Sequence, residues 1–270
     1  YKDDPCAQFK VKGGEAATEA ENHLNIQIHK AISIIQFKLE GQLLERRPEY
    51  HMEHRRLLHR IDYEKGTITI KNKEYPLLDT NFPTIDPEHP YELTAEEAEV
   101  MERLRIAFLK CDKLQSHMKL LLNRGSLYKV YNGNLLYHGC IPLNANGGFK
   151  EVQVYGKTYK GKALYDILEV YVRRAFFAVD EKERAKGADL MWYIWAGPNS
   201  PLFGKDQMTT FERYFIADKA THVELKNAYY DFLEDEQVVD KILQEFGLGK
   251  EGTHIINGHV PVHHKDGESP

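Results

Sequence analysis

Two histidines in the chain each follow a short apolar run and stand next to a glycine. Residues 135–137 precede His138, and residues 253–258 precede His259. Each run predicts a short buried strand that ends at an imidazole, at the edge of a sheet where ligand sites commonly gather. A neutral imidazole at the end of a rigid strand suits manganese, iron or zinc. A single histidine of this kind is more often a core or surface residue, but the repeated arrangement predicts that both are metal ligands.

These two histidines do not complete a metal site. A two-metal phosphatase uses roughly six ligands, including a bridging carboxylate. The segments that commonly supply them, Asp-x-His, Gly-Asp-x-x-Asp-Arg-Gly and Gly-Asn-His-Asp/Glu, are absent from the sequence. The chain begins at Tyr1 rather than at a methionine and ends at Pro270, soon after the second histidine. We therefore expect a segment of a longer protein, whose N-terminal part supplies the other ligands.

Composition indicates a soluble globular protein. Of the 270 residues, 42% are hydrophobic and 29% are charged, which is ordinary for such proteins. The net charge of −5 is spread along the chain, so no nucleic-acid partner is expected. No apolar run approaches the roughly 18 residues of a membrane span, so no membrane partner is expected either. Cys6, Cys111 and Cys140 form no Cys-x-x-Cys pair, which argues against a structural zinc and for a reducing cytoplasm.

Residues 1–123 are predicted to form a helical region with one small hairpin. Residues 18–21 have the spacing of a capping box. Apolar residues then recur at steps of three and four from Leu24 to Leu39, which predicts one helix to about Arg47 that buries a single stripe. The other predicted elements are a shorter helix at 51–61, a hairpin at 67–77 and a helix at 95–123, opened by a second capping box at 94–97 and predicted to be the longest of the chain.

Residues 124–270 are predicted to combine strands and helices. The Asn132-Gly133 turn lies between the runs 127–131 and 135–137, which is typical of a tight hairpin. The continuous apolar run at 190–195 predicts a strand buried on both faces. The other predicted elements are strands at 152–155 and 253–257 and helices at 162–177 and 225–246.

Three short segments resemble motifs of one enzyme superfamily. Residues 136–142, Leu-Tyr-His-Gly-Cys-Ile-Pro, resemble the His-Gly-Gly-Leu/Ile-Ser-Pro segment of the phosphoprotein phosphatase branch of calcineurin-like metallophosphoesterases. Residues 195–199 lie where that branch has Trp-Ser-Asp-Pro, and His259 lies where it has its final histidine. Over its whole length, including residues 199–205 and 210–215, the sequence is similar to the bacterial class III fructose-1,6-bisphosphatases.

The resemblance implies an α+β fold, in which residues 124–270 are the C-terminal half of a four-layer metallophosphoesterase sandwich and residues 1–123 are a helical insertion. The implied enzyme is a phosphoric monoester hydrolase that removes the C1 phosphate of fructose 1,6-bisphosphate in gluconeogenesis, a part of carbohydrate metabolism. The implied cofactor is Mn²⁺ in a two-metal site, with His138 and His259 on the second metal. The long amphipathic helices lead us to expect a homo-oligomer, and the segment alone is expected to be inactive.

The cations that would hold the substrate depart from the pattern of the superfamily. Protein phosphatases carry an arginine after Trp-Ser-Asp-Pro, whereas the nearest cation here is Lys205, with Arg213 further on. A lysine cannot form the bidentate fork of a guanidinium, so the substrate geometry is expected to differ. Both residues are candidates for substrate binding, and the alternative is that each is an ordinary surface cation. His263 and His264 are expected to be outside the ligand set, and no catalytic residue is assigned.

Two other functions are compatible with the sequence. One is a phosphoprotein phosphatase with helical insertions, which would share the metal chemistry but act on a phosphopeptide. The other is a non-catalytic helical scaffold or a subunit-interface module, which the two long amphipathic helices would serve. The scaffold would be favoured if the intact protein held no manganese or iron and the His138 and His259 rings lay more than about 7 Å apart, because ligand bonds are only about 2 Å long.

Overall fold

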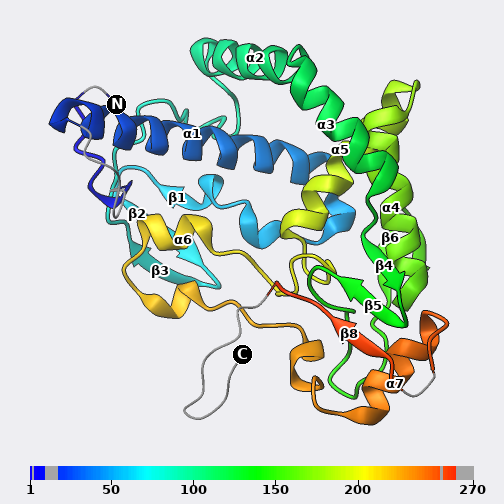
Figure 1. The fold of residues 1–270 in the computed structure, drawn as a ribbon. Helices are drawn as coiled ribbons and strands as arrows, with labels where there is room; N and C mark the ends of the chain where they lie inside the picture. The colour runs from blue at the N-terminus through cyan, green and yellow to red at the C-terminus, as the bar shows by residue number, and fades with distance from the viewer. Residues whose placement is uncertain (2, 10–17, 250–251, 260–270) are drawn as a thin grey trace. The chain divides into compact units, whose positions relative to one another are not determined.

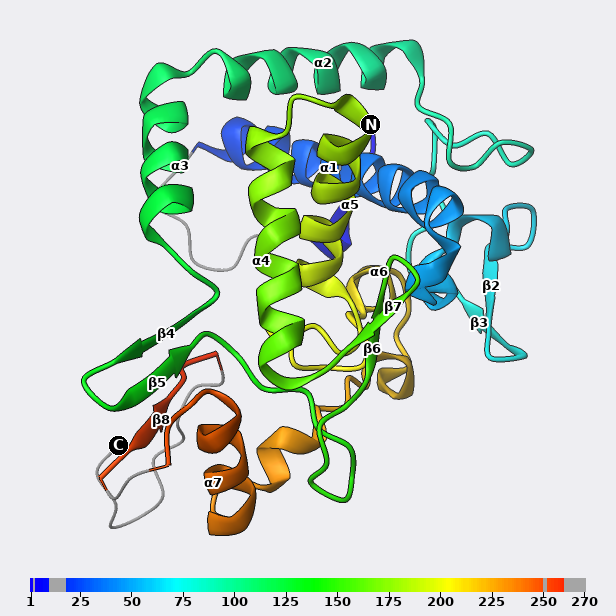
Figure 2. The same ribbon diagram turned by 90° about the vertical axis from the view of Figure 1, so that its right-hand side faces the viewer.

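The computed structural model describes residues 1, 3–9, 18–249 and 252–259. The chain forms two compact units. Unit 1 consists of Tyr1–Gln115 and Thr209–Val223, and unit 2 of Ser116–Met208 and Glu224–Pro270. Both units combine helices with small sheets (Figures 1 and 2), which confirms the mixed α+β class. The division follows spatial proximity, so unit 1 includes the distant segment 209–223. The domain boundary expected after residue 123 stays a prediction.

The first helix of unit 1, α1 (Glu19–Arg46), begins as the sequence predicts. The Thr18 side chain accepts a hydrogen bond from the Glu21 backbone, and the Glu21 carboxylate accepts one from Thr18. Its buried face, however, differs from the prediction. Ile28 is 54% exposed, whereas Lys30 and Lys38 are fully buried. The apolar periodicity therefore identified the helix but not the face that packs against the unit.

Buried ion pairs explain why two lysines of α1 lie inside unit 1. The Lys30 ammonium lies 2.5 Å from a carboxylate oxygen of Asp4 and 2.7 Å from one of Asp79. The Lys38 ammonium lies 2.7 Å from Glu97 and also donates to a backbone carbonyl. A buried charge is tolerated only where such partners replace its hydration. These contacts connect α1 to the N-terminal segment, to the loop at residue 79 and to the next helix.

The sheet of unit 1 is a small antiparallel meander. Its strands are β1 (Ile61–Asp62), β2 (Thr67–Ile70) and β3 (Lys73–Pro76), in the order β1-β2-β3. The predicted hairpin is confirmed, whereas the predicted helix at 51–61 is wrong. That stretch forms two 3-10 turns, Glu53–Arg55 and Leu58–Arg60. The core of unit 1 also takes apolar side chains from α6 (Thr210–Phe215); its buried members are Cys6, Phe9, Ile34, Phe37, Leu57, Leu58, Ile61, Ile68, Phe82, Ile85, Phe211, Phe215 and Ile216.

The long helix predicted at 95–123 is two helices, and α1 is the longest helix among the described residues. The chain forms α2 (Ala95–Leu109), with the expected capping box at its start, and then α3 (Asp112–Arg124). The Gln115 side chain donates to the Phe108 carbonyl at 3.1 Å, so this carbonyl is paired although the helix stops. Apolar spacing continues across the break, which is why the periodicity could not reveal it.

Unit 2 contains a three-stranded sheet in the order β4-β5-β8. Its strands β4 (Tyr128–Tyr131) and β5 (Asn134–Tyr137) form the predicted hairpin, with Asn132 and Gly133 at positive φ in the turn, as a type I′ turn requires. The third strand, β8 (His254–Ile256), pairs with β5 in parallel. A separate hairpin joins β6 (Val152–Val154) to β7 (Lys157–Tyr159).

The apolar run at 190–195 is not a strand but the end of a helix. Helix α5 (Glu181–Ala196) starts at Asp180, whose side chain accepts a hydrogen bond from the Glu183 backbone. It packs against α4 (Gly161–Phe177), which confirms the helix predicted at 162–177. A Cβ on Gly187 would lie 2.4 Å from the Ala175 backbone nitrogen. Gly187 therefore allows the two helices to approach each other closely at this position.

The helix predicted at 225–246 is shorter than expected. Helix α7 covers only Glu236–Glu245, preceded by a 3-10 turn at Ala228–Asp231. The Asn227 and Asp235 side chains each accept a hydrogen bond from a nearby backbone N–H, and such local bonds start new turns. The buried core of unit 2 includes Leu135, Tyr137, Cys140, Ile141, Leu143, Tyr165, Tyr229, Ile242, Leu243 and Phe246.

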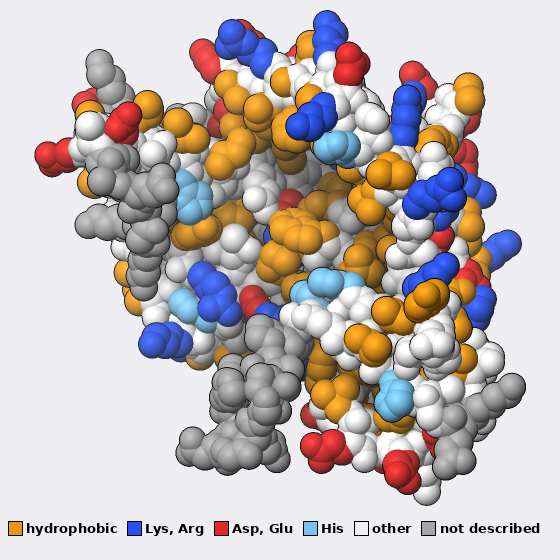
Figure 3. Space-filling model, in the orientation of Figure 1, with side chains coloured by type: hydrophobic (Ala, Val, Ile, Leu, Met, Phe, Trp, Pro, Cys, Tyr) orange, Lys and Arg blue, Asp and Glu red, His pale blue; other side chains and the backbone are white. Residues whose placement is uncertain are grey.

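The surface mixes apolar and charged side chains. On the face drawn in Figure 3, hydrophobic groups lie among basic and acidic ones. On α2, Val100, Leu104 and Phe108 recur every four residues and are 42%, 39% and 61% exposed. Within the part of the chain that the structure describes, none of the helices combines the length and apolar character that crossing a bilayer requires.

Lys30 offers a direct test of the buried ion pairs. We expect Lys30→Ala to lower the free energy of unfolding by about 3–5 kcal/mol, because two carboxylates are then left buried without a cation. Urea unfolding followed by circular dichroism measures this change. The matched control is Lys65→Ala, which removes an exposed pair with Asp62 and should leave the stability nearly unchanged. Equal effects of the two substitutions would contradict the account.

Candidate metal centre

Parallel pairing of β5 and β8 brings the two histidines of the sequence prediction together. Leu135 pairs with Ile255 and Leu136 with Ile256, and both strands end just before a histidine turn. Figures 1 and 2 show β8 lying along β5. Beyond the ladder, the His138 carbonyl accepts hydrogen bonds from the backbone N–H groups of Gly258 at 3.2 Å and His259 at 2.9 Å.

The two imidazole rings lie edge to face at this junction, with their planes inclined by 66°. His259 Nδ1 lies 2.9 Å from His138 Nε2, and the ring centroids are 4.8 Å apart. Two nitrogen ligands bound at about 2.1 Å to one ion and about 90° apart lie about 3 Å from each other. The observed separation therefore fits one metal ion held by both rings. Without a metal, the same distance suits a hydrogen bond in which one ring donates its N–H.

The loop after α5 contacts the turn that contains His138, Gly139 and Cys140. The Cys140 backbone N–H donates to the Pro201 carbonyl at 2.8 Å. A Cβ on Gly139 would lie only 2.4 Å from that same carbonyl oxygen, so a residue with a side chain cannot occupy this position without moving the loop. The glycine beside His138 is thus required by the close approach of two backbone segments.

The electrostatic environment favours the neutral form of His259. Burial and the neighbouring His138 ring hold the pKa of His259 below its ordinary value, the charge of Lys205 adds to this effect, and a hydrogen bond with the Phe203 backbone partly opposes it. A ring with a lowered pKa is unprotonated at pH 7, which is the form that binds a metal. The hydrogen bond with a backbone carbonyl is also a common way to orient a ligating histidine.

Lys205 lies in the same unit, close enough for its charge to act on His259. Its ammonium forms an ion pair of 2.7 Å with Glu224, and the two side chains are 34% and 11% exposed. Lys205 is thus oriented by a carboxylate and still partly open to solvent. An anionic group beside the histidines could share this cation.

Arg213 belongs to α6 of unit 1, and its guanidinium donates to the His222 carbonyl at 3.1 Å. Its assignment as a substrate contact stays a prediction from the sequence resemblance. His263 and His264 lie outside the described residues. In the parts of the chain that the structure describes, no group of three or more histidine, cysteine, aspartate or glutamate side chains could hold a metal ion. The two histidines are therefore fewer than the ligands that a complete metal site needs.

The sequence reasoning missed three residues that support the centre: Asn257, Phe203 and Glu224. The Asn257 side chain donates to the Gly139 carbonyl at 2.8 Å. Phe203 acts through its backbone, which no residue-type pattern can reveal. Glu224 is 19 positions from Lys205 in sequence. Only Asn257 carried a usable signal, because it is the last residue of the strand predicted at 253–257 and stands directly before Gly258.

Cys140 lies beside the first histidine but has the environment of a packing residue. It is fully buried, and burial raises the pKa of its thiol to about 12. The thiol therefore stays protonated at physiological pH, and it is not a reactive nucleophile there.

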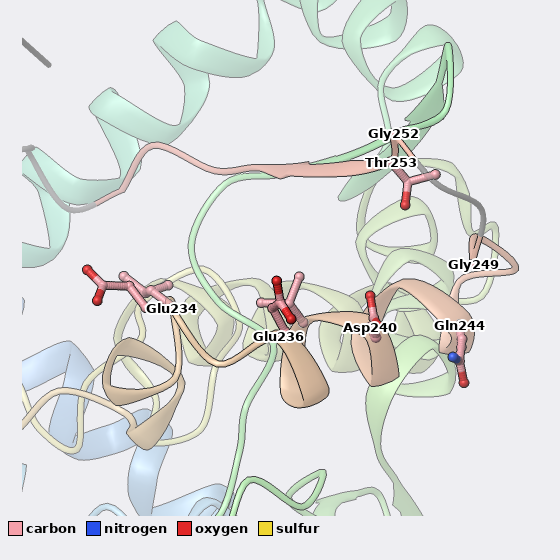
Figure 4. A pocket seen from close by; sticks show the side chains of 9 residues that line it. Glu234, Glu236, Asp240, Gln244, Gly249, Gly252 and Thr253 are labelled. Atoms are coloured by element: carbon pink, nitrogen blue, oxygen red, sulfur yellow. The ribbon is translucent and has the colours of Figure 1, made fainter.

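A hollow elsewhere in unit 2 is lined by acidic side chains. It lies between α7 and the segment that enters β8 (Figure 4) and has a volume of about 610 Å³. Three carboxylates, Glu234, Glu236 and Asp240, line it. Their charge would repel a sugar bisphosphate, so this hollow does not suit an anionic substrate.

Comparison with known proteins places the chain in a family. Residues 1–270 match the family model described as Firmicute fructose-1,6-bisphosphatase. The chain is 52% identical to the class 3 fructose-1,6-bisphosphatases of Alkaliphilus metalliredigens and Clostridium acetobutylicum, and 53% identical to that of Fusobacterium nucleatum. No solved structure matches it. The chain therefore belongs to the Firmicute fructose-1,6-bisphosphatase family.

Each of these alignments covers all of this chain but only 41% of the relative. The chain thus spans about two-fifths of the length of the curated relatives that it matches. The resemblance expected from the motifs around His138 and His259 is confirmed at the level of the family. The activity of the relatives belongs to longer proteins.

Proposed function

We propose that the chain is part of a metal-dependent phosphatase that hydrolyses fructose 1,6-bisphosphate at its C1 phosphate. The observation that carries this proposal is the approach of His138 Nε2 and His259 Nδ1 to 2.9 Å at the ends of two paired strands. Membership of the Firmicute fructose-1,6-bisphosphatase family supports the choice of substrate. The proximity of the rings argues against the non-catalytic scaffold, and the names of the relatives do not favour a phosphoprotein phosphatase.

In this proposal the two histidines are ligands of one divalent ion, for which we propose Mn²⁺ as the second metal of a two-metal site. A bound divalent metal supplies positive charge that activates water and stabilises the transferring phosphoryl group. The contribution of this chain is to hold two imidazole rings in a fixed direction at the end of a sheet. We propose that the remaining ligands, including a bridging carboxylate, come from a further, N-terminal part of the protein.

Lys205 is proposed as a contact for a substrate phosphate. Its charge acts on His259, so a phosphate beside the histidines would lie within its field. The ion pair with Glu224 already restricts the Lys205 side chain. Less side-chain conformational entropy is therefore lost when a phosphate binds. A lysine binds phosphate as a point charge, so this contact would stabilise the substrate without fixing its orientation.

We also propose that the protein acts in the cytoplasm. Cys6, Cys111 and Cys140 are all free thiols, which suits a reducing compartment. The proposed substrate, a sugar bisphosphate of carbohydrate metabolism, would be present in the same compartment.

The histidine pair gives the first test of the proposed activity. We expect His138→Ala and His259→Ala, each in the full-length protein, to lower kcat/KM for fructose 1,6-bisphosphate at least about 100-fold without unfolding it, because each removes a metal ligand. The matched control is His254→Ala, an exposed histidine at the start of β8, which should retain activity. Wild-type turnover in either ligand variant would remove that residue from the site.

The same assay separates the two candidate substrates. The proposal requires that the full-length protein release phosphate from fructose 1,6-bisphosphate much faster than from a phosphopeptide. A preference for the phosphopeptide would support the phosphoprotein phosphatase instead.

The role of Lys205 predicts a change in substrate affinity. Lys205→Met should raise KM for fructose 1,6-bisphosphate about tenfold, because a charge-assisted contact with phosphate is lost, and should change kcat less. The matched control is Lys226→Met, since the Lys226 ammonium lies over the Tyr230 ring in the same unit and has no proposed contact with substrate. An unchanged KM in Lys205→Met would leave Lys205 as a surface cation.

We propose that the protein is a homo-oligomer and that a second copy covers an apolar groove of unit 1. The groove runs between α1 and α2 and is lined by Ile28, Ile32, Ile35, Pro83 and Val100, among others. Exposed apolar surfaces of this kind commonly mark contacts between proteins.

A charge in this groove tests the oligomer. Ile28→Glu in the full-length protein should shift the sedimentation coefficient to that of a smaller species, because the carboxylate would be buried in the contact. The control is Leu225→Glu, an exposed apolar position in unit 2. A monomeric wild-type protein, or an unchanged assembly in Ile28→Glu, would contradict the proposal.

A further inference from the structure

The Asn257 side chain connects the two histidine turns. Asn257 is half-buried and follows the last residue of β8. Its amide nitrogen Nδ2 donates to the Gly139 carbonyl at 2.8 Å. Gly139 is the residue next to His138, and Asn257 precedes His259 by two positions. The bond therefore runs from one turn to the other, close to both rings.

This bond continues the strand pairing where the backbone ladder stops. The last paired residues are Leu136 and Ile256. Beyond them the His138 carbonyl takes the N–H groups of Gly258 and His259. The Gly139 carbonyl comes next along the chain, and the Asn257 amide takes the place of a backbone donor there. Besides the contact between the two rings, three hydrogen bonds thus join the two turns, and one of these three depends on the Asn257 side chain.

The two turns differ in how firmly they are packed. A Cβ on Gly139 would collide with the Pro201 carbonyl at 2.4 Å, whereas a Cβ on Gly258 would meet none of the described residues within 4 Å. The turn of His138 is therefore fixed by contact with the loop behind it. Among the described residues, hydrogen bonds rather than packing around Gly258 join the turn of His259 to the rest of the unit.

We propose that Asn257 is a positioning residue of the metal centre, which fixes the His259 turn to the rigid His138 turn through the Gly139 carbonyl. Asn257 does not bind the metal in this arrangement. It acts by keeping the two rings correctly oriented. A mobile turn would have to become ordered when the metal binds, and this ordering costs part of the binding free energy. This inference rests on the proposed function only in that His138 and His259 bind one metal ion.

The test measures Mn²⁺ binding to the full-length protein by isothermal titration calorimetry. The binding event that His138→Ala removes defines the histidine-dependent site. We expect Asn257→Ala to weaken this event 10- to 100-fold, as is typical when a partner behind the metal ligands is lost, with an unchanged melting temperature. The matched control is Asn144→Ala, because the Asn144 amide likewise donates to a carbonyl in unit 2; its affinity should equal that of the wild type.

A spectroscopic measurement separates positioning from general stability. Nitrogen couplings of bound Mn²⁺, measured by electron spin-echo modulation, should report two imidazoles in the wild type and fewer in Asn257→Ala. If the alanine variant does not fold, Asn257→Leu, which has a similar volume and lacks the donor, replaces it in both measurements.

The outcomes distinguish this inference from the proposed function. If His138→Ala and His259→Ala both retain Mn²⁺ binding, the proposed metal centre is wrong and the positioning role of Asn257 is overturned with it. If both lose binding and Asn257→Ala keeps the affinity and couplings of the wild type, only the role of Asn257 is overturned. A selective loss in Asn257→Ala, with Asn144→Ala unchanged, supports the inference.

Discussion

The parallel pairing of β5 with β8 is the constraint on which the histidine centre depends. It joins segments about 120 positions apart in the sequence, as in the contact between Asn134 and His254. Side chains in a strand alternate between the two faces, so a slip of one residue would turn the paired side chains to the opposite face. The register of Leu135 with Ile255 is therefore what brings both rings to the same side of the sheet edge, where one ion could contact both.

The surroundings of the pair act on its geometry and on its charge. The loop carbonyl at Pro201 leaves no room for a side chain at Gly139, which fixes the first turn. Burial, the other ring and the charge of Lys205 lower the pKa of His259, so the second ring keeps a free lone pair at neutral pH. A cation that disfavours a proton on the ring is also well placed to attract an anionic substrate. In the proposed function, one set of contacts would thus prepare both metal binding and substrate binding.

The sequence predicted the parts of this centre that local chemistry determines. The Asn132-Gly133 turn, the strands beside it and the strand before His259 follow from turn residues and apolar runs. The helix α5 was missed because a continuous apolar run suits a buried helix as well as a strand. The buried face of α1 was missed because Lys30 lies inside only through its pairs with Asp4 and Asp79, which are distant in sequence. Contacts of the backbone, such as that of Phe203 with His259, leave no trace in residue types.

The central claim is that one metal ion binds between His138 and His259. The most direct measurement is a crystal structure of the full-length protein with Mn²⁺, using anomalous scattering to locate the metal. The account predicts an anomalous peak at about 2.1 Å from both His138 Nε2 and His259 Nδ1. A fully occupied metal site that contacts neither ring, with the rings still hydrogen-bonded to each other, would contradict it.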